Sequence, residues 1–327
     1  MTLSPDHIAA SCLLAASMIT LSTAQAHAQA PYPTQQIKFV ITHAAGGLPD
    51  TVARIVGRRM QERMGQSVVV ENRPGANGAI AVQAMLGVPA DGYTLIVTDG
   101  AIVTSNPVLV IKLGYGVQDI LAIAGLGRAP LFLAVHPKVP ATTFAEFVAY
   151  VKERPGQINF GSSGVGSLHH LSMEAMAASL GLKMVHVPFK GTGESVPALL
   201  GGHIETLKSA FPSLSGAAEG KQIRFLAVNS AQRSAQAPQL PAIAETIPDF
   251  DFAPVVGLYG RSGTPADIVA RLSSEAIAIM KEPEIVKQFA VVGVEPTGQG
   301  PAEFAKALDG EAKRIAQAVE ISGIKPR

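Results

Sequence analysis

The sequence predicts an α/β protein in which mostly parallel sheets are covered by helices. The first observation is an alternation along the chain between short apolar runs and segments whose apolar residues recur at helical spacing. The second is a pair of glycine-rich turns, Gly46-Gly47 and Ser163-Gly164-Val165-Gly166-Ser167, each placed between a predicted strand and a predicted helix. Alternation of this kind is typical of parallel strands joined by crossover helices.

The first strand–turn–helix unit spans residues 36–65. Residues 36–41 are a predicted strand, and Gly46-Gly47 lets the backbone turn where a Cβ would clash. Pro49 suits the first helical position, Asp50 suits the first turn, and Gly65 is expected to end the helix. Bare N–H groups at the start of such a helix form a site for an anion, although many α/β turns of this kind bind nothing.

The second unit repeats this arrangement. Residues 158–162 are a predicted short strand, and Ser167 is placed to cap a helix that carries Leu168 and Leu171. Two helix N-termini would then face one cleft if the two turns meet. The spacing along the chain leaves open whether they do.

Other segments continue the alternation. Further strands are predicted at residues 67–71, 93–98, 131–135, 183–189, 223–228 and 255–259. Thr143 and Glu146 form a capping-box signature, Thr264-Pro265 indicates a second capped helix start, and Pro301 opens the last amphipathic helix.

Glycine and proline cluster at residues 125–130 and 249–254, where we expect the chain to cross between two lobes. The predicted organisation is a first lobe of residues 31–125 plus 254–327 and a second lobe of residues 126–253. Two crossings make a hinge, and closure around a ligand would follow as a population shift.

Composition excludes several classes of function. The formal net charge is +1, so no broad basic face for nucleic acid is expected. Cys12 is the only cysteine, and the histidines lack the spacing of a helical metal-binding pair. No phosphate-binding glycine motif is complete. We therefore expect neither a metal site nor a cofactor.

Residues 1–28 are predicted to be a secretory signal peptide. Residues 8–21 form an interrupted apolar run, alternating small residues follow it, and cleavage is expected after Ala28. The absence of Lys and Arg before Lys38 departs from the usual signal and leaves a misassigned start codon as the alternative. The expected location is the periplasm.

Blocks spread over nearly the whole mature chain match one family pattern, in the family's order. They include Gly46-Gly47-x-x-Asp50-x-x-Ala53-Arg54, Asp91-Gly92-Tyr93-Thr94-Leu95, Asn159-Phe160-Gly161-Ser162-Ser163-Gly164 and His186-Val187-Pro188-Phe189-Lys190-Gly191. In these blocks the chain resembles the Bug-type substrate-binding proteins of tripartite tricarboxylate transporters.

This resemblance implies a Venus-flytrap fold of the type II periplasmic-binding-protein class. It also implies a receptor that catalyses nothing and delivers a small carboxylate to membrane permease subunits, and we expect a monomer. The family pattern predicts a binding site made of backbone groups of both glycine turns and the end of a third strand. Pro188 and Lys190 would form the far wall of this cleft. The candidate ligand-binding residues are Ala45, Gly46, Gly47, Leu48, Asp50, Thr98, Asp99, Gly100, Ser163, Gly164, Gly166, Ser167, Pro188 and Lys190.

Some roles stay open. Asp50 would cap its own loop or meet a ligand amine, and Lys190 would be a cleft cation or a solvated turn residue. The chain departs from the family at Thr42-His43-Ala44-Ala45, where Pro-Phe or Pro-Tyr is usual, and it has no Trp. The ligand is therefore not identified.

Two other functions are compatible with the same scaffold. A periplasmic hydrolase would use Ser163 or Ser167 with His169 or His170, although Val165 breaks the G-x-S-x-G pattern. A sensory receptor would differ from a transport receptor only in its membrane partner.

Overall fold

The computed structural model describes residues 32–43 and 45–326. The chain divides into two units, Met1–Thr34 and Gln35–Arg327, and the description below concerns the second unit. The predicted signal peptide with its cleavage point at Ala28, and Cys12 with it, lie outside the described residues.

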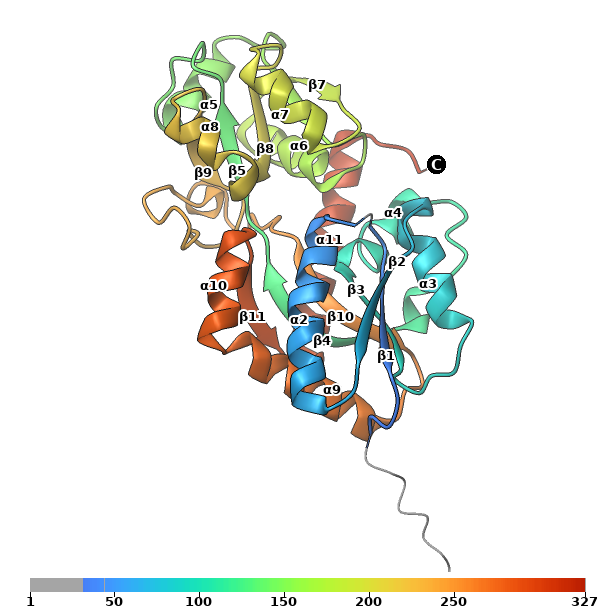
Figure 1. Cartoon of the computed structure of the whole chain (residues 1–327). Helices are drawn as coiled ribbons and strands as arrows, with labels where there is room; N and C mark the ends of the chain where they lie inside the picture. The colour runs from blue at the N-terminus through green and yellow to red at the C-terminus, as the bar shows by residue number, and fades with distance from the viewer. Residues whose placement is uncertain (1–31, 44, 327) are drawn as a thin grey trace, which may run out of the picture. The chain divides into compact units, whose positions relative to one another are not determined.

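A six-stranded sheet contains the first and the last strand of the second unit, β1 and β11 (Figure 1). Its strand order is β11 (Glu295–Gln299), β4 (Ile120–Arg128), β10 (Val255–Arg261), β3 (Thr94–Asp99), β1 (Ile37–Ile41) and β2 (Val68–Asn72). Helices α2 (Leu48–Met64) and α9 (Ala266–Met280) contact each other over one face, where Gly57 of α2 lies against Phe39. Helices α3 (Ala79–Leu86) and α11 (Pro301–Ser322) pack on the other face around Val40, Ile96 and Tyr259.

A second sheet has five strands. Its order is β7 (Val185–Pro188), β6 (Asn159–Ser162), β8 (Thr206–Ala210), β5 (Leu131–Val135) and β9 (Arg224–Val228). Helices α5 (Phe144–Lys152) and α6 (Leu168–Leu180) share one apolar cluster with Leu133 and Phe160. Helices α7 (Thr192–Leu200) and α8 (Ser215–Glu219) pack around Ala134 and Leu207. The short helices α4 (Asn106–Leu109) and α10 (Pro283–Val291) complete the set of α-helices among the described residues.

The two-lobe α/β fold is confirmed, but the expectation of mostly parallel sheets is wrong in detail. Strands β1, β2 and β3 pair in parallel, as do β6, β7 and β8. Strands β4, β10 and β11 are antiparallel to their neighbours, and β5 is antiparallel to β8 and β9. Strands β5 and β10 are each reached from a strand of the other sheet, so no crossover helix holds them to the parallel direction.

Three strands, β4, β8 and β11, were not predicted from the sequence, and the reason can be identified for each. β4 contains Gly125 and Gly127, which weaken strand propensity, yet a Cβ at Gly127 would lie 2.4 Å from Val294. β8 carries the buried Lys208, and β11 carries a proline and a glycine. Glycine is required in β4 because neighbouring side chains approach its backbone closely.

Most predicted helix starts are confirmed. Thr143 and Glu146 form both bonds of the capping box at the start of α5, and Ser167 caps α6. The capped start at Thr264 is wrong: α9 begins at Ala266, and the Thr264 hydroxyl donates to the carbonyl of Arg261 at 2.7 Å. No described helix combines the length and apolar character needed to cross a membrane.

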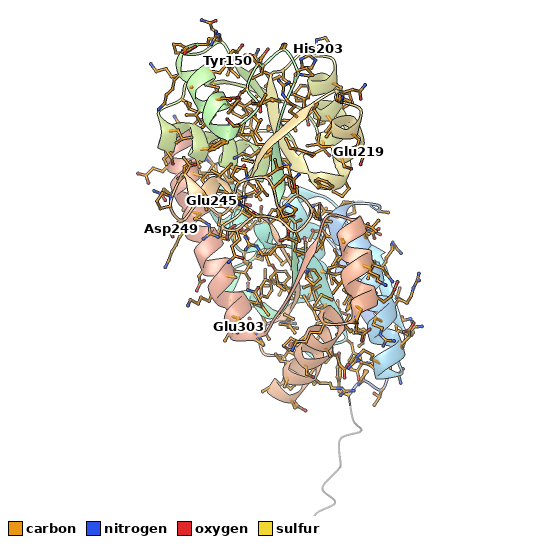
Figure 2. The ribbon with its side chains drawn as sticks, turned by 90° about the vertical axis from the view of Figure 1, so that its left-hand side faces the viewer. Tyr150, His203, Glu219, Glu245, Asp249 and Glu303 are labelled. Carbon is orange, nitrogen blue, oxygen red and sulfur yellow. The ribbon has the colours of Figure 1, made fainter. Side chains whose placement is uncertain are left out.

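Helix α11 supplies apolar side chains to both cores. Phe304 and Leu308, in its first half, join the cluster around β3 and β10, whereas Ile315 and Ala318 join the cluster of α5 and α6. Figure 2 shows the helix rising from Glu303 along the ribbon. The predicted lobe boundaries stay a prediction. Strand β4 contains the first of them, between residues 125 and 126, and continues to Arg128.

Candidate functional site

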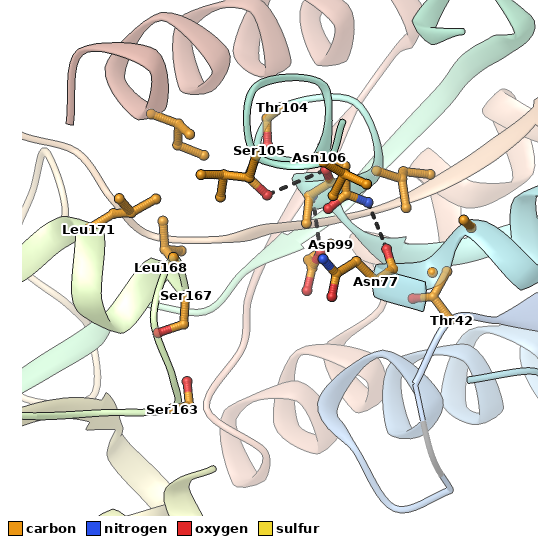
Figure 3. A pocket seen from close by; sticks show the side chains of 18 of the residues that line it. Thr42, Asn77, Asp99, Thr104, Ser105, Asn106, Ser163, Ser167, Leu168 and Leu171 are labelled. Carbon is orange, nitrogen blue, oxygen red and sulfur yellow. Dashed lines mark hydrogen bonds between the residues drawn. The ribbon is translucent and has the colours of Figure 1, made fainter. Parts of the chain in front are cut away.

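A cavity of about 930 Å³ lies between the loops that follow β1 and β3 and the start of α6. Figure 3 shows Ser163 and Ser167 on one side of it and Asp99 and Asn77 on the other. Its polar lining residues include Thr42, His43, Asn77, Asp99, Thr104, Ser105, Asn106, Lys112, Ser163, Ser167, His169, Glu311 and Lys325. Leu109, Leu131, Leu168, Leu171 and Ile315 are among the apolar ones.

The wall at the start of α6 is a glycine turn held by side chains. Ser162 Oγ accepts from the N–H of Gly164 at 3.1 Å, and Ser167 Oγ accepts from the N–H of His170 at 3.3 Å. Gly164 and Gly166 have φ values of +118° and +80°, which other residues rarely adopt. The turn therefore places the N-terminus of a thirteen-residue helix at the cavity wall.

Histidines pack behind this turn. The rings of His170 and His186 stack at 3.7 Å between centroids, and His186 Nε2 lies 2.6 Å from Ser162 Oγ. Burial, reinforced by the neighbouring His170, lowers the pKa of His186 to about 4. His170 Nδ1 accepts from the N–H of Gly166 at 3.2 Å, so this nitrogen is unprotonated.

Ser163 and His169 form a pair at the cavity surface. Ser163 Oγ lies 2.7 Å from His169 Nδ1, and burial, followed by the charge of Lys208, lowers the pKa of His169 to about 4. No carboxylate among residues 32–43 and 45–326 bonds to His169. The pair therefore lacks the acidic partner that orients the base in a catalytic triad.

Hydroxyl, imidazole and carboxylate groups line the opposite wall. The Thr42 and Thr98 hydroxyls lie 2.5 Å apart, and Thr42 Oγ1 lies 2.8 Å from His43 Nδ1. His43 Nε2 lies 3.6 Å from Asp99 Oδ2, while Asp99 Oδ1 accepts from the N–H of Ala101 at 3.0 Å. Asp99 is thereby fixed at the end of β3 with one oxygen toward His43.

A buried acid lies behind this wall. Glu311 of α11 is only 6 % exposed, and Thr104 Oγ1 lies 3.0 Å from its Oε1. Burial raises the pKa of Glu311 to about 7, and the charge of Asp99 adds to this effect. Gly100 makes the approach possible, because a Cβ there would lie 2.7 Å from Glu311 Oε1.

The structure brings four of the predicted site residues into this cavity: Asp99, Ser163, Gly166 and Ser167. Gly46 and Asp50 instead line a separate cavity of about 310 Å³ with Arg54. The other predicted residues line neither cavity, and their role in binding stays a prediction: Ala45, Gly47, Leu48, Thr98, Gly100, Gly164, Pro188 and Lys190.

Asp50 already has partners within its own lobe. Its Oδ2 accepts from the N–H of Gly46 at 2.9 Å, and Arg54 and Asn72 both donate to its Oδ1 at 2.9 Å. Burial opposes ionisation of this carboxyl, but the bonds from Arg54, Gly46 and Asn72 together lower its pKa. Of the two roles left open, the structure supports the loop cap.

Several lining residues were missed from sequence, among them Asn77, Asn106 and Glu311. For Glu311 a signal exists, because it lies on the apolar stripe of the last helix between Leu308 and Ile315. Loop residues such as Asn77 give no comparable signal. Among the described residues, no group of three or more His, Cys, Asp or Glu side chains is arranged to hold a metal ion.

Comparison with known proteins identifies the family. The model of the "Tripartite tricarboxylate transporter family receptor" matches residues 52–324. Protein BugT of Bordetella pertussis is 30% identical over 297 residues, covering 90% of this chain and 91% of BugT. A protein from the tcbD–tcbE intergenic region of Pseudomonas sp. strain P51 is 28% identical, covering 92% and 91% of the two chains.

Solved structures agree with this match. R. palustris Rpa4515 with adipate has a TM-score of 0.78 at 31% identity, covering 90% of this chain and all of that one. MatC from Rhodopseudomonas palustris with bound malate has a TM-score of 0.71 at 26% identity, covering 88% and 100% of the two chains. The chain belongs to the family of receptors of tripartite tricarboxylate transporters.

Proposed function

We propose that the protein is an extracytoplasmic receptor that binds a small carboxylate in the 930 Å³ cavity and delivers it to a tripartite tricarboxylate transporter. The observation that carries the proposal is the start of α6, where Gly166 and Ser167 line the cavity at the positive end of the helix. The relatives described with adipate and with malate support a carboxylate as the ligand.

Two lysine side chains in the cavity lining also favour an anion. Lys112 and Lys325 line it, and neither forms an ion pair with an acid of the described chain. Each hydrogen bond to a charged oxygen contributes about 1.5–3 kcal/mol, so three or four of them are enough for a micromolar site at about −8 kcal/mol after ordering costs.

Family membership supports a periplasmic transport role for the protein. We place the mature protein in the periplasm, as a monomer without catalytic activity, with the permease subunits of the transporter as its partners. Its two lobes, residues 31–125 plus 254–327 and residues 126–253, would close around the ligand. Closure would bring the predicted Gly46-Gly47 turn and Lys190 nearer to the ligand.

A thermal-shift panel tests the carboxylate site. We expect adipate, malate or a related acid to raise the melting temperature of refolded protein, since a ligand at 100 times its Kd adds about 2.7 kcal/mol of stability. The diamide of adipic acid is the matched control, because it has the same chain without charge. A flat response of refolded protein to the whole acid panel, or an equal response to acid and diamide, would contradict the proposal.

Hydrolysis is the second candidate function, favoured by the 2.7 Å contact between Ser163 and His169. It predicts turnover of an ester probe that disappears in Ser163→Ala. As a receptor, the protein would return its ligand unchanged after prolonged incubation.

A further inference from the structure

The starting point is the hydrogen bonding of the buried acid Glu311. Thr104 Oγ1 lies 3.0 Å from Glu311 Oε1 and also 3.0 Å from the carbonyl oxygen of Gly100. A hydroxyl group has one proton to donate and can also accept. Each contact is a full two-centre hydrogen bond when Thr104 donates to the carbonyl and accepts a hydrogen bond from a neutral Glu311 carboxyl.

The second oxygen of Glu311 leads to the same conclusion. Oε2 is buried, and no group of the described chain bonds to it. An ionised carboxylate in that position would leave a buried charge without a donor, which is far less favourable than a buried neutral carboxyl. The Tyr259 hydroxyl, on β10, is likewise buried without a described partner.

Charged and titratable groups face Glu311 from four parts of the chain. Asp99 lies at the end of β3, and Asp251 precedes β10; both disfavour ionisation of Glu311. Arg314, one turn further along α11, favours it but is held by Asp251, with its Nε donating to the carbonyl oxygen of that residue at 2.6 Å. Tyr259 completes this environment. Two acids therefore oppose one partly engaged cation.

We propose that a carboxylate ligand binds in the cavity with uptake of one proton by Glu311. The inference rests on the proposed function and adds a proton linkage to it. Glu311 lines the cavity from behind Gly100, so an anion bound there adds negative charge to a site that already disfavours a second one. The ligand stays ionised, the proton comes from solvent, and this proton offsets one negative charge of the ligand.

The linkage has a defined pH window. Below about pH 7 Glu311 is already neutral, so binding takes up no proton at this residue. Above pH 7 each binding event must protonate it, and the Kd rises by up to about tenfold per pH unit. The receptor thereby holds its ligand more tightly at mildly acidic pH than at alkaline pH.

Isothermal titration calorimetry with adipate at pH 8, in buffers of different ionisation enthalpy, measures the uptake directly. We expect close to one proton per adipate for the wild type and close to none for Glu311→Gln, because Gln keeps the shape of the neutral acid. Glu275→Gln is the matched control: Glu275 is a buried acid paired with Arg63 and Arg271 outside the cavity, so its variant should keep the wild-type uptake. His43→Asn tests a lining histidine as the alternative proton acceptor.

The possible failures are distinguishable. Adipate binding with no proton uptake, or uptake that persists in Glu311→Gln and disappears in His43→Asn, would overturn the linkage and leave the receptor function intact. If neither adipate nor malate binds at pH 6 or at pH 8, the proposed function fails and the linkage fails with it.

Discussion

Three side chains near the cavity have a pKa that their surroundings shift in favour of the neutral form: Glu311, His169 and His186. In each case burial is the largest cause of the pKa shift, because a charge loses its hydration inside the protein. The shifts have opposite directions for the acid and the imidazoles. Protein stability should therefore fall on both sides of an intermediate pH.

Glu311 sets the alkaline side. Its pKa in the folded protein is about 7 against an ordinary 4.5, so the folded state binds more protons between these values. The contribution to stability is present below pH 4.5 and is lost as pH rises through 7. As pH rises from 4.5 to 8, the wild type should lose about 2–3 kcal/mol of unfolding free energy relative to Glu311→Gln. Urea denaturation at each pH measures this difference. Parallel pH profiles would contradict this.

His186 contributes to the acid side. Its pKa in the folded protein is about 4 against 6.5, so the unfolded state binds more protons in this range. The melting temperature should therefore fall as pH drops from 6.5 toward 4, and His186→Asn should flatten that fall. The exposed His203, labelled in Figure 2, is the control: His203→Asn should leave the profile unchanged. Equal effects of the two variants would refute the assignment.

At the scale of elements, the start of α6 combines two roles, since Ser167 caps the helix and lines the cavity. Ser167→Ala should lower the unfolding free energy by about 1 kcal/mol and weaken carboxylate binding by about tenfold. Chemical denaturation and calorimetry measure the two effects separately.

Thr143 offers the matched control for this variant. Its hydroxyl caps α5 by accepting from the N–H of Glu146 at 3.2 Å, and it lies outside the cavity. Thr143→Ala should lower stability by a similar ~1 kcal/mol without changing the Kd. A Kd that is unchanged in Ser167→Ala would remove the start of α6 from the binding site.

At the scale of the whole molecule, α11 joins the two apolar cores and also carries Glu311. Its packing depends on Gly257 in β10, where a Cβ would lie 2.0 Å from Phe304 Cζ. Gly257→Ala should push α11 away from the sheet and lower the unfolding free energy by about 1–3 kcal/mol. Because α11 positions Glu311 behind the cavity, this variant should also change the pH dependence of binding.

Gly216 provides the comparison for that variant. It lies in α8. Apart from its chain neighbours and the nearby backbone of its own helix, no atom lies within 4 Å of the position a Cβ would take there. Gly216→Ala should therefore leave the melting temperature unchanged or raise it slightly, since Ala favours helix by about 1 kcal/mol. If both alanine variants melt alike, close packing of Phe304 on Gly257 is not important for stability.

The features that could be predicted from sequence are those with short-range causes. The starts of α5 and α6 were predictable because a cap joins residues three apart, as Ser167 and His170 are. The two-lobe α/β fold followed from the alternation of strand and helix patterns and from the family resemblance. The mixed strand directions did not follow, because pairing between β4, β10 and β11 joins segments far apart in the chain.

The cavity shows the same division. Local patterns indicated Ser163, Gly166 and Ser167 as groups at a helix start, since glycine conformations and capping depend on near neighbours. Only the tertiary structure decided that Asp99 faces them, that Gly46 and Asp50 line a different cavity, and that Glu311 is buried with a raised pKa. Glu311 lies against Gly100 and contacts Thr104, which is 207 residues away in the sequence. Burial and hydrogen bonding set the pKa of such a group, and folding alone brings these residues together.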